Sequence, residues 1–330
     1  MNKPAIKAVL LAVALLFSAC AKEKQYFETS GEVFHTSFHI KYRYTRALDA
    51  EIKVELDNFD LSLNPFNKQS IIYKVNNNIP TALNPWFEAV FRRAMEISDI
   101  SGGTYDITCA PLINLWGFGF DKIDSVNQAV IDSLKEFVGY RKVRLENGAV
   151  VKDDPRLQLN ASSLAKGYSC DVIAEMLDKH GVIDYMVEIG GEVRAKGLNP
   201  HGECWKIQIA KPIDDKSGQI NERQEVVALC GRSVATSGNY RNFYIKDGKK
   251  IAHTINPLTG YPAESNILGA SVFCADCMSA DAFATAFMTM DKDRAVAIAE
   301  TIPGLDYLFI YADVDGNLKE AKSDGIEFEW

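Results

Sequence analysis

The sequence predicts an α+β fold, with one large domain built from two intimate α/β lobes. Helical and strand-like segments are mixed along the chain without strict alternation, which disfavours a doubly wound parallel sheet. Of the 330 residues, 47% are hydrophobic and 24% are charged, so the chain can bury a sizeable core. Because a single core stops growing near about 250–300 residues, this length suits one large domain or two closely packed lobes.

The N-terminal segment has the pattern of a bacterial targeting signal. Lys3 and Lys7 provide a basic start, an apolar run covers residues 8–17, and the small residues Ser18-Ala19 precede Cys20. The apolar run is shorter than the roughly 20 residues that span a bilayer. A cysteine directly after Ser-Ala is typical of a lipobox, in which that cysteine becomes the lipidated first residue of the mature protein.

We therefore predict a lipoprotein signal peptide over residues 1–19, a tether over residues 20–30 after lipidated Cys20, and one functional domain over residues 31–330. The alternative is an ordinary secretory signal with an incidental cysteine. Either signal places the mature chain outside the cytoplasm. The lipobox further predicts a lipid anchor in a bacterial cell envelope, with the domain facing the periplasm.

Charge and cysteine content narrow the classes of ligand. The net charge of -8 argues against a nucleic-acid partner, although a metal and backbone amides can still hold phosphate. Six cysteines follow Cys20, and some are expected to pair in an oxidising compartment. Cys274 and Cys277 form a C-x-x-C pair, but a zinc site needs a second pair or suitably spaced histidines. We interpret these two as packing residues or a possible disulfide.

Periodicity and capping residues predict the individual elements. Asn84 and Pro85 form a good N-cap and N1 pair. Ser162 or Ser163 is expected to cap one later helix, and Ser279 another. The expected helices cover residues 47–59, 84–97, 125–138, 162–180 and 278–288. The expected strands cover residues 185–189, 205–209, 225–229, 269–273 and 307–311.

Residues 234–262 form the most distinctive stretch, VATSGNYRNFYIKDGKKIAHTINPLTGYP. It opens with an expected small-residue turn, Thr236-Ser237-Gly238. Asp247-Gly248 between two β-prone triplets then predicts a hairpin, because Asp-Gly tolerates the positive φ angles of a two-residue turn. The stretch ends in a tight loop that carries His253 and Thr259-Gly260, where hydroxyls and backbone N–H groups can converge on one point.

Three further stretches contain residue types that can line the pocket of a planar ligand, attract anions or permit the close approach of another backbone. Asp106 and Thr108 lie in a segment of glycines and aromatics typical of a pocket for a planar ligand. Lys166 follows an expected helix start, where free N–H groups and the dipole attract anions. Gly190-Gly191 follows a strand and permits close approach of another backbone or a ligand. The G-x-G-x-x-G spacing is missing there, so we exclude a dinucleotide Rossmann site.

The segment 278–288 contains a candidate metal site. Asp281 and Thr285 are four residues apart and therefore share one helix face. A carboxylate and a hydroxyl in this arrangement form a partial shell for a hard cation such as Mg²⁺, which completes its coordination with water and substrate phosphate. The structural alternative is an N-terminal helix charge beside a packed threonine.

Together these motifs resemble those of the FAD:protein FMN transferases, the ApbE-like flavin transferases, which are often periplasmic lipoproteins. The resemblance covers essentially the whole mature chain, in order. The matching segments are LSLNPFNKQSIIYKVN, GGTYDITCAPLINLWGFG, SSLAKGYSCD, VEIGGE, VATSGNYRNF, HTINPLTGYP and MSADAFATAFM. The most specific of them is HTINPLTGYP followed by ADAFAT.

The resemblance implies an ApbE-like fold with FAD in the cleft between two lobes. It implies a Mg²⁺-dependent transfer of FMN from FAD to a threonine or serine hydroxyl of a target protein, with release of AMP. Asp281, Thr285 and the main-chain carbonyl of Ala165 would then be metal ligands. His253 would be the general base, and Thr259 with Gly260 would approach the pyrophosphate. The other implied FAD-binding residues are Asn64, Asp106, Thr108, Lys166, Gly190, Gly191 and Ser237. The implied acceptors are flavoprotein subunits of extracytoplasmic or membrane electron-transport systems.

Two positions depart from the family pattern. Many members have Asp where this chain has Asn160, and transferases tend to carry an aromatic residue after the Leu-Ser pair, where this chain has Asn64. The resemblance implies that some relatives with a polar residue at the second position hydrolyse FAD to FMN and AMP, with water in place of the protein hydroxyl. Pyrophosphatase activity is therefore one alternative function. A non-catalytic FAD-binding lipoprotein is an alternative of another class.

Overall fold

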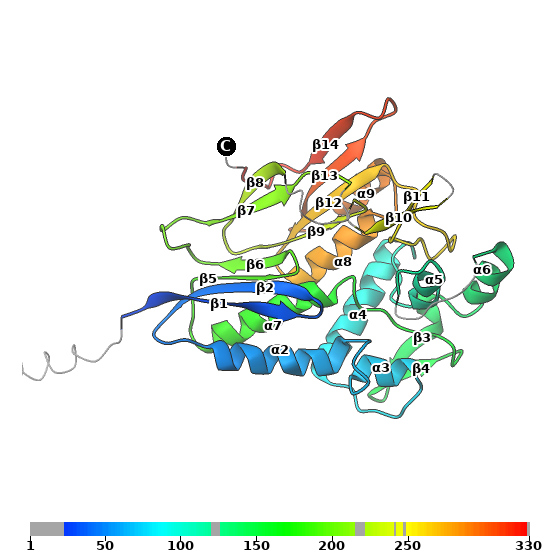
Figure 1. Cartoon of the computed structure of the whole chain (residues 1–330), viewed down its shortest axis with the longest axis horizontal. Coiled ribbons are helices and arrows are strands. Elements are labelled where there is room, and N and C mark those ends of the chain that lie inside the picture. The colour runs from blue at the N-terminus through cyan, green and yellow to red at the C-terminus, as the bar shows by residue number, and fades with distance from the viewer. Residues whose placement is uncertain (1–22, 120–125, 215–221, 241, 247–248, 329–330) are drawn as a thin grey trace, which may run out of the picture.

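A computed structural model describes residues 23–119, 126–214, 222–240, 242–246 and 249–328 (Figure 1). Its centre is an eight-stranded sheet in the order β1-β2-β5-β6-β9-β12-β13-β14, in which every neighbouring pair is antiparallel. The strands are β1 Gln25–Val33, β2 Thr36–Tyr44, β5 Tyr185–Ile189, β6 Glu192–Lys196, β9 Ser233–Gly238, β12 Ile267–Cys274, β13 Asp306–Ala312 and β14 Leu318–Lys322. This mixed arrangement of helices and one large sheet confirms the predicted α+β class.

The sheet consists of two four-stranded halves joined by a short ladder. Strands β6 and β9 pair only through Val193 with Val234 and Arg194 with Ser233. The β5–β6 hairpin on one side of this junction turns at Gly190 and Gly191, whose φ values of 66° and 98° suit glycine. The junction brings residues from both halves of the chain to one place, and the candidate site lies beside it.

Four long helices form a layer on one side of the sheet (Figure 1). They are α2 Asp49–Leu63, α4 Pro85–Ile100, α7 Ala165–Lys179 and α8 Cys277–Phe287. Helix α7 contacts β5 and β6, α8 contacts β9 and β12, and the two helices pack on each other. Helix α2 then lies on α7, and α4 on α8. Phe283 and Phe287 of α8 are fully buried against Phe309 of β13, which anchors α8 in the core.

A two-stranded ribbon covers the other side of the sheet. It consists of β7 Trp205–Ala210 and β8 Arg223–Leu229, and its ends are joined by the disulfide Cys204–Cys230. Phe273 packs with the apolar side chains of the ribbon, whereas its neighbour Val272 packs with the helical layer. Because successive strand residues point to opposite faces, the ribbon and the helices lie on opposite sides of the sheet.

Smaller elements complete the described chain. They are α3 Ile71–Asn76, α5 Ala110–Leu115, α6 Gln128–Lys135, the 3₁₀ turn Tyr140–Lys142, β3 Val143–Glu146, β4 Ala149–Lys152, β10 Phe243–Lys246, β11 Lys249–Ala252 and α9 Lys292–Ala299. Within the described ranges, we find no helix whose length and apolar content suffice for a transmembrane span.

Several expected elements are confirmed, including the strand at Tyr185–Ile189 and the helix whose N-cap Asn84 accepts a hydrogen bond from the N–H of Phe87. The expected turn at Thr236–Gly238 is wrong, because these residues pair with β12 as the end of β9. Residues 25–30, which were assigned to a tether, instead pair with β2. The signal segment, Cys20 and Asp247-Gly248 lie outside the described residues.

Two predicted helix caps are also wrong, and one of the two interpretations of Cys274 and Cys277 is confirmed. Helix α7 begins after Leu164, without a side-chain cap from Ser162 or Ser163. The N-cap of α8 is Asp276, which accepts from the N–H of Ser279 and so replaces Ser279 in that role. Cys274 and Cys277 are buried free thiols, which confirms the packing interpretation and excludes their disulfide.

Candidate functional site

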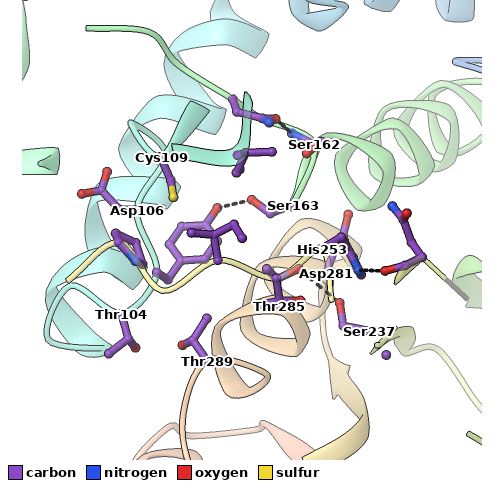
Figure 2. A pocket seen from close by; sticks show the side chains of 18 of the residues that line it. Thr104, Asp106, Cys109, Ser162, Ser163, Ser237, His253, Asp281, Thr285 and Thr289 are labelled. Carbon is purple, nitrogen blue, oxygen red and sulfur yellow. Dashed lines mark hydrogen bonds between the residues drawn. The ribbon is translucent and has the colours of Figure 1, made fainter. Parts of the chain in front are cut away.

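A cavity of about 380 Å³ lies where α7, α8, β9 and two loops meet (Figure 2). The segment Thr104–Asp106 forms one wall and the loop from His253 to Pro257 another. The remaining lining includes Lys166, Glu192, Ser237, Asp281 and Thr285, together with further polar side chains and with Cys109 and Ile113. Residues from six separate parts of the sequence therefore converge on one hollow.

Three charged groups dominate the electrostatics of the cavity. Lys166 forms an ion pair with Glu192, whose side chain is only 5% exposed, and Asp281 lies close enough to raise the pKa of both groups. Burial lowers the pKa of Lys166, but the two carboxylates raise it more, so the ammonium group stays charged. Burial raises the pKa of Glu192 and of Asp281, and Lys166 opposes both shifts. When both carboxyl groups are ionised, their charge exceeds that of the single ammonium group, so a cation in this cavity would stabilise the ionised forms.

The donor atoms fit a hard divalent cation. Asp281 accepts from the N–H of Gly167 through Oδ2, at 3.0 Å. Oε2 of Glu192 is buried and has no hydrogen-bond partner in the described part of the chain. One helical turn beyond Asp281, Oγ1 of Thr285 lies 3.2 Å from Oγ of Ser237. No group of three or more His, Cys, Asp or Glu side chains suited to a metal occurs among the described residues, so hydroxyl, carbonyl, water or substrate oxygens must complete any site.

The implied carbonyl ligand lies on the neighbouring helix. Ala165 is the first residue of α7, and it lines a smaller cavity of about 180 Å³ that shares Ser162 and Lys166 with the main one. Asn64 also lines this smaller cavity. Its amide is held locally, because Nδ2 donates to Asp60 and Oδ1 accepts from the N–H of Phe66.

His253 has one nitrogen available for proton transfer. Its Nδ1 lies 3.2 Å from the backbone oxygen of Asn242. A carbonyl oxygen only accepts, so Nδ1 carries the hydrogen and the neutral ring keeps its lone pair on Nε2. Burial lowers the pKa of His253 below its usual value of 6.5. The hydrogen bond to Asn242 partly opposes this shift, and the charge of Lys166 lowers the pKa further. The imidazole is therefore neutral and able to accept a proton at neutral pH.

Asp106 lies in the wall of the cavity, but its carboxylate also organises a loop. Oδ1 accepts from the N–H and the hydroxyl of Thr108, and Oδ2 accepts from the N–H of Tyr140. Burial raises the pKa of Asp106 above its usual value, although these three hydrogen bonds act to lower it. Thr108 is fully buried behind Asp106 and is not part of the lining. In the view of Figure 2, Asp106 lies across the cavity from Asp281 and Thr285.

Four other predicted site residues lie outside this lining. Gly190 and Gly191 form the β5–β6 turn, where a Cβ on Gly190 would lie 3.1 Å from Cδ of Lys166. Thr259 is exposed and borders a separate hollow next to Trp116. The carbonyl of Gly260 accepts a 2.8 Å bond from Nε1 of Trp116. The structure thus places Gly190 behind Lys166, gives Thr259 contacts within its own loop, and ties Gly260 to Trp116.

Some lining residues were not recognised from the sequence. Glu192 belongs to the segment VEIGGE, yet its ion pair with Lys166 depends on a fold that joins residues 26 positions apart. Tyr105 accepts a hydrogen bond from Ser163 through its hydroxyl, and Thr289, just beyond the end of α8, adds another polar group to the lining. A search for charged residues directly after Gly-Gly turns would have identified Glu192, but no local signal identifies Tyr105.

Comparison with known proteins gives consistent results over most of the chain. The ApbE family matches residues 34–309. The chain is 34% identical over 304 residues to the FAD:protein FMN transferase of Vibrio cholerae, covering 88% of this chain and 90% of that protein. It is 32% identical over 331 residues to the FAD:protein FMN transferase of Haemophilus influenzae, covering 95% and 94%.

Solved structures agree with these sequence matches. The flavin transferase ApbE from Vibrio cholerae aligns with a TM-score of 0.80 at 31% identity, covering 91% of this chain and 98% of that one. The apo form of the flavinyl transferase ApbE from Pseudomonas stutzeri aligns with a TM-score of 0.79 at 26% identity, covering 92% and 96%.

Proposed function

Because the chain belongs to the ApbE family, we propose that it is an FAD:protein FMN transferase that uses Mg²⁺. The observation that carries this proposal is the convergence of His253, Asp281 and Thr285 on one cavity, although they come from a loop and a helix that are separated by strand β12. The cavity combines a neutral base with two carboxyl groups and one ammonium group. Phosphoryl transfer requires a positioned nucleophile, a proton acceptor and neutralisation of phosphate charge.

The proposed reaction moves FMN to a threonine or serine hydroxyl of an acceptor protein. The hydroxyl oxygen bonds to the phosphorus of the FMN part, the pyrophosphate P–O bond breaks, and AMP leaves with the bridging oxygen. Nε2 of His253 accepts the hydroxyl proton, which its lowered pKa permits at neutral pH. Asp281, Thr285 and the carbonyl of Ala165 would hold Mg²⁺, which supplies charge neutralisation on the pyrophosphate when bound.

The remaining cavity residues support binding of FAD. Lys166 offers a positive charge at the wall shared by the two cavities, and Glu192 holds that charge in place. Ser237 and Asp106 contribute polar groups on separate walls of the main cavity. We propose that FAD occupies the main cavity and extends towards the smaller one that is lined by Asn64.

Location and partners follow from the N-terminal sequence and from the reaction. We propose that Cys20 carries a lipid, that the protein is anchored in a bacterial cell envelope, and that it faces the periplasm. Its acceptors would then be flavoprotein subunits of extracytoplasmic or membrane electron-transport systems. Labelling with radioactive palmitate in a bacterial host tests the anchor. Loss of label in Cys20→Ala is expected, and equal labelling of the variant would contradict it.

The decisive experiment incubates the full chain with FAD, Mg²⁺ and a candidate acceptor. Covalent flavin on the acceptor, seen by in-gel fluorescence and intact mass, is expected together with one AMP per flavin. Asp281→Ala should abolish both products, because it removes the only carboxylate in the assigned ligand set. Asp276→Ala is the matched control, since it lies on the same helix and caps its N-terminus without lining the cavity. Undiminished turnover in Asp281→Ala would refute the ligand assignment.

Asn64 favours a second candidate, the FAD pyrophosphatase. It places a polar amide in the smaller cavity next to Ala165 and Lys166, where a water molecule can be held instead of a protein hydroxyl. This alternative predicts free FMN and AMP from FAD and Mg²⁺ without any acceptor, and no labelled acceptor when one is added. A non-catalytic FAD-binding lipoprotein would bind FAD tightly and release no AMP under either condition.

A further inference from the structure

A buried carboxylate outside the cavity joins the two helices that carry the proposed metal ligands. Asp171 lies on α7, and its side chain is 5% exposed. Oδ1 accepts from the backbone N–H of Cys277 at 2.9 Å, and Oδ2 from that of Met278 at 2.8 Å. Arg194 of β6 completes the contact with a 2.5 Å ion pair to Oδ1. Asp171 therefore ties α7 to the first turn of α8 and to the central sheet.

The same two helices make a reciprocal contact, one turn earlier on α7 and one turn later on α8. Gly167 precedes Asp171 by one turn of α7, and its N–H donates to Asp281, which follows Cys277 by one turn of α8. Each helix thus places a carboxylate on a backbone N–H near the start of the other. We call these paired contacts, Asp171 to Cys277 and Met278, and Gly167 to Asp281, the α7–α8 clasp.

We propose that Asp171 is a positioning residue for the divalent-cation site. This inference rests on the proposed function, in which Ala165 of α7 and Asp281 with Thr285 of α8 share one ion. Two helices that supply ligands to one ion must keep a fixed separation, and each N–H bond of Asp171 restrains α8 relative to α7. Residues that do not touch the metal but hold its ligands in place orient those ligands in this way. Loss of such a residue typically weakens metal binding by about 10–100-fold.

The chain offers a natural control for simple helix capping. Asp276 caps the same end of α8, accepting from the N–H of Ser279 at 2.8 Å and from its hydroxyl at 2.6 Å. Both aspartates accept hydrogen bonds from N–H groups that a helix start leaves free. Both also place a carboxylate at the positive end of the helix dipole, where negative charge is stabilising. Only Asp171 belongs to α7, so only its bonds connect the start of α8 to the neighbouring helix. If capping alone mattered, Asp276→Asn and Asp171→Asn would affect metal binding alike.

The test measures metal binding directly, on the metal-free full chain without FAD. Mn²⁺ is titrated and followed by electron paramagnetic resonance, Mg²⁺ by calorimetry, and urea unfolding is recorded for each variant. Asp171→Asn is expected to raise the Kd for Mn²⁺ by about tenfold or more, whereas Asp276→Asn changes it by less than about threefold. Both variants are expected to unfold at lower urea concentration.

In turnover assays, Asp171→Asn should raise the Mg²⁺ concentration for half-maximal rate, while the rate at saturating Mg²⁺ stays near that of the unaltered protein.

Two results would overturn the inference. One is an unchanged Mn²⁺ Kd in Asp171→Asn, and the other is an equal rise in Asp276→Asn. Where Asp171→Asn fails to fold because Arg194 is left unpaired, the double variant Asp171→Asn/Arg194→Gln removes that charge and is titrated in its place. Asp281→Asn separates the inference from its premise. If Asp281→Asn still binds Mn²⁺ like the unaltered protein, the metal assignment itself fails. If it loses Mn²⁺ while Asp171→Asn does not, only the positioning role of Asp171 fails.

Discussion

The N–H of Gly167 donates a 3.0 Å hydrogen bond to Oδ2 of Asp281, across 114 positions of sequence. This bond is possible because α7 and α8 approach each other more closely than any side chain on Gly167 would permit. It leaves the other carboxylate oxygen of Asp281 available to the cavity. The contact of one glycine with one aspartate thus connects the packing of the helices to the chemistry of the site.

Gly167→Ala should disrupt this approach. An added Cβ would lie 2.2 Å from the backbone oxygen of Cys277 and 2.8 Å from Cβ of Asp281, so the helices must separate. We expect a loss of about 1–3 kcal/mol in the free energy of unfolding, even though alanine otherwise favours a helix. Urea denaturation measures it. Gly269→Ala is the control, since its added Cβ meets nothing nearer than 3.9 Å. Equal stability of the Gly167 variant and the unaltered protein would contradict the close contact.

His253→Ala should slow flavin transfer by about 10²–10⁴-fold and leave FAD binding largely intact. Because burial lowers the pKa of His253 below 6.5, the neutral base persists at mildly acidic pH. The rate of the unaltered enzyme should therefore fall only as the pH drops through that lowered pKa, and His253→Ala should lack this acidic limb. Transfer rates against pH and FAD fluorescence titrations give the two readouts. Loss of FAD binding alone would indicate a structural role instead.

Lys166→Met should destabilise the protein by leaving Glu192 and Asp281 without their cation. Breaking a fully buried pair costs about 3–5 kcal/mol, and we expect about 2–3 kcal/mol here because solvent screens the partly exposed Lys166. Glu192→Gln in the same chain should restore part of that loss. A double-mutant cycle from denaturant unfolding measures the coupling. Additive single effects would show that the pair contributes no net interaction.

The cost of Lys166→Met should also depend on pH. Burial holds the folded pKa of Glu192 above its usual value of 4.5, so the folded state binds the proton more tightly than the unfolded state does. The stabilisation from this protonation is complete below pH 4.5 and is lost as the pH rises through the higher folded pKa. Lys166 lowers the pKa of Glu192, so this pKa rises further in Lys166→Met. The deficit should therefore grow as the pH rises above about 7, the folded pKa of Glu192 in the unaltered protein, in the same unfolding assay. A deficit that shrinks over this range would contradict the assignment.

Removal of the disulfide should affect stability without affecting turnover. Cys204 and Cys230 close a loop with a sequence separation of 26. Their replacement by serine should cost about 3.5 kcal/mol through the regained chain entropy of the unfolded state. The ribbon packs on the sheet face opposite to the helices, so the FAD reaction should persist below the lowered melting temperature. Calorimetry and transfer assays on the same sample distinguish the two effects. A proportional loss of turnover at low temperature would show that the ribbon supports the site.

Local sequence was sufficient for features that depend on neighbouring residues. The cap at Asn84, the strand Tyr185–Ile189 and the shared face of Asp281 and Thr285 follow from dihedral preference and periodicity. These properties operate over one or two turns, so tertiary contacts had little opportunity to override them. The local cap at Ser279 failed because Asp276 caps the helix three residues earlier, so the N–H of Ser279 is itself a donor to Asp276.

Contacts between distant segments were decided only by the tertiary structure. The packing of α7 on β6 brings Glu192 to Lys166 and Arg194 to Asp171, and the ribbon brings Cys204 to Cys230. Hydrophobic periodicity predicts which face of an element is buried, but it does not specify the element that covers that face. The sequence by itself therefore determined the local elements and the types of chemical group that the chain can supply. The antiparallel sheet decided which of these groups share a cavity, because only burial against a particular neighbour places two side chains within bonding distance.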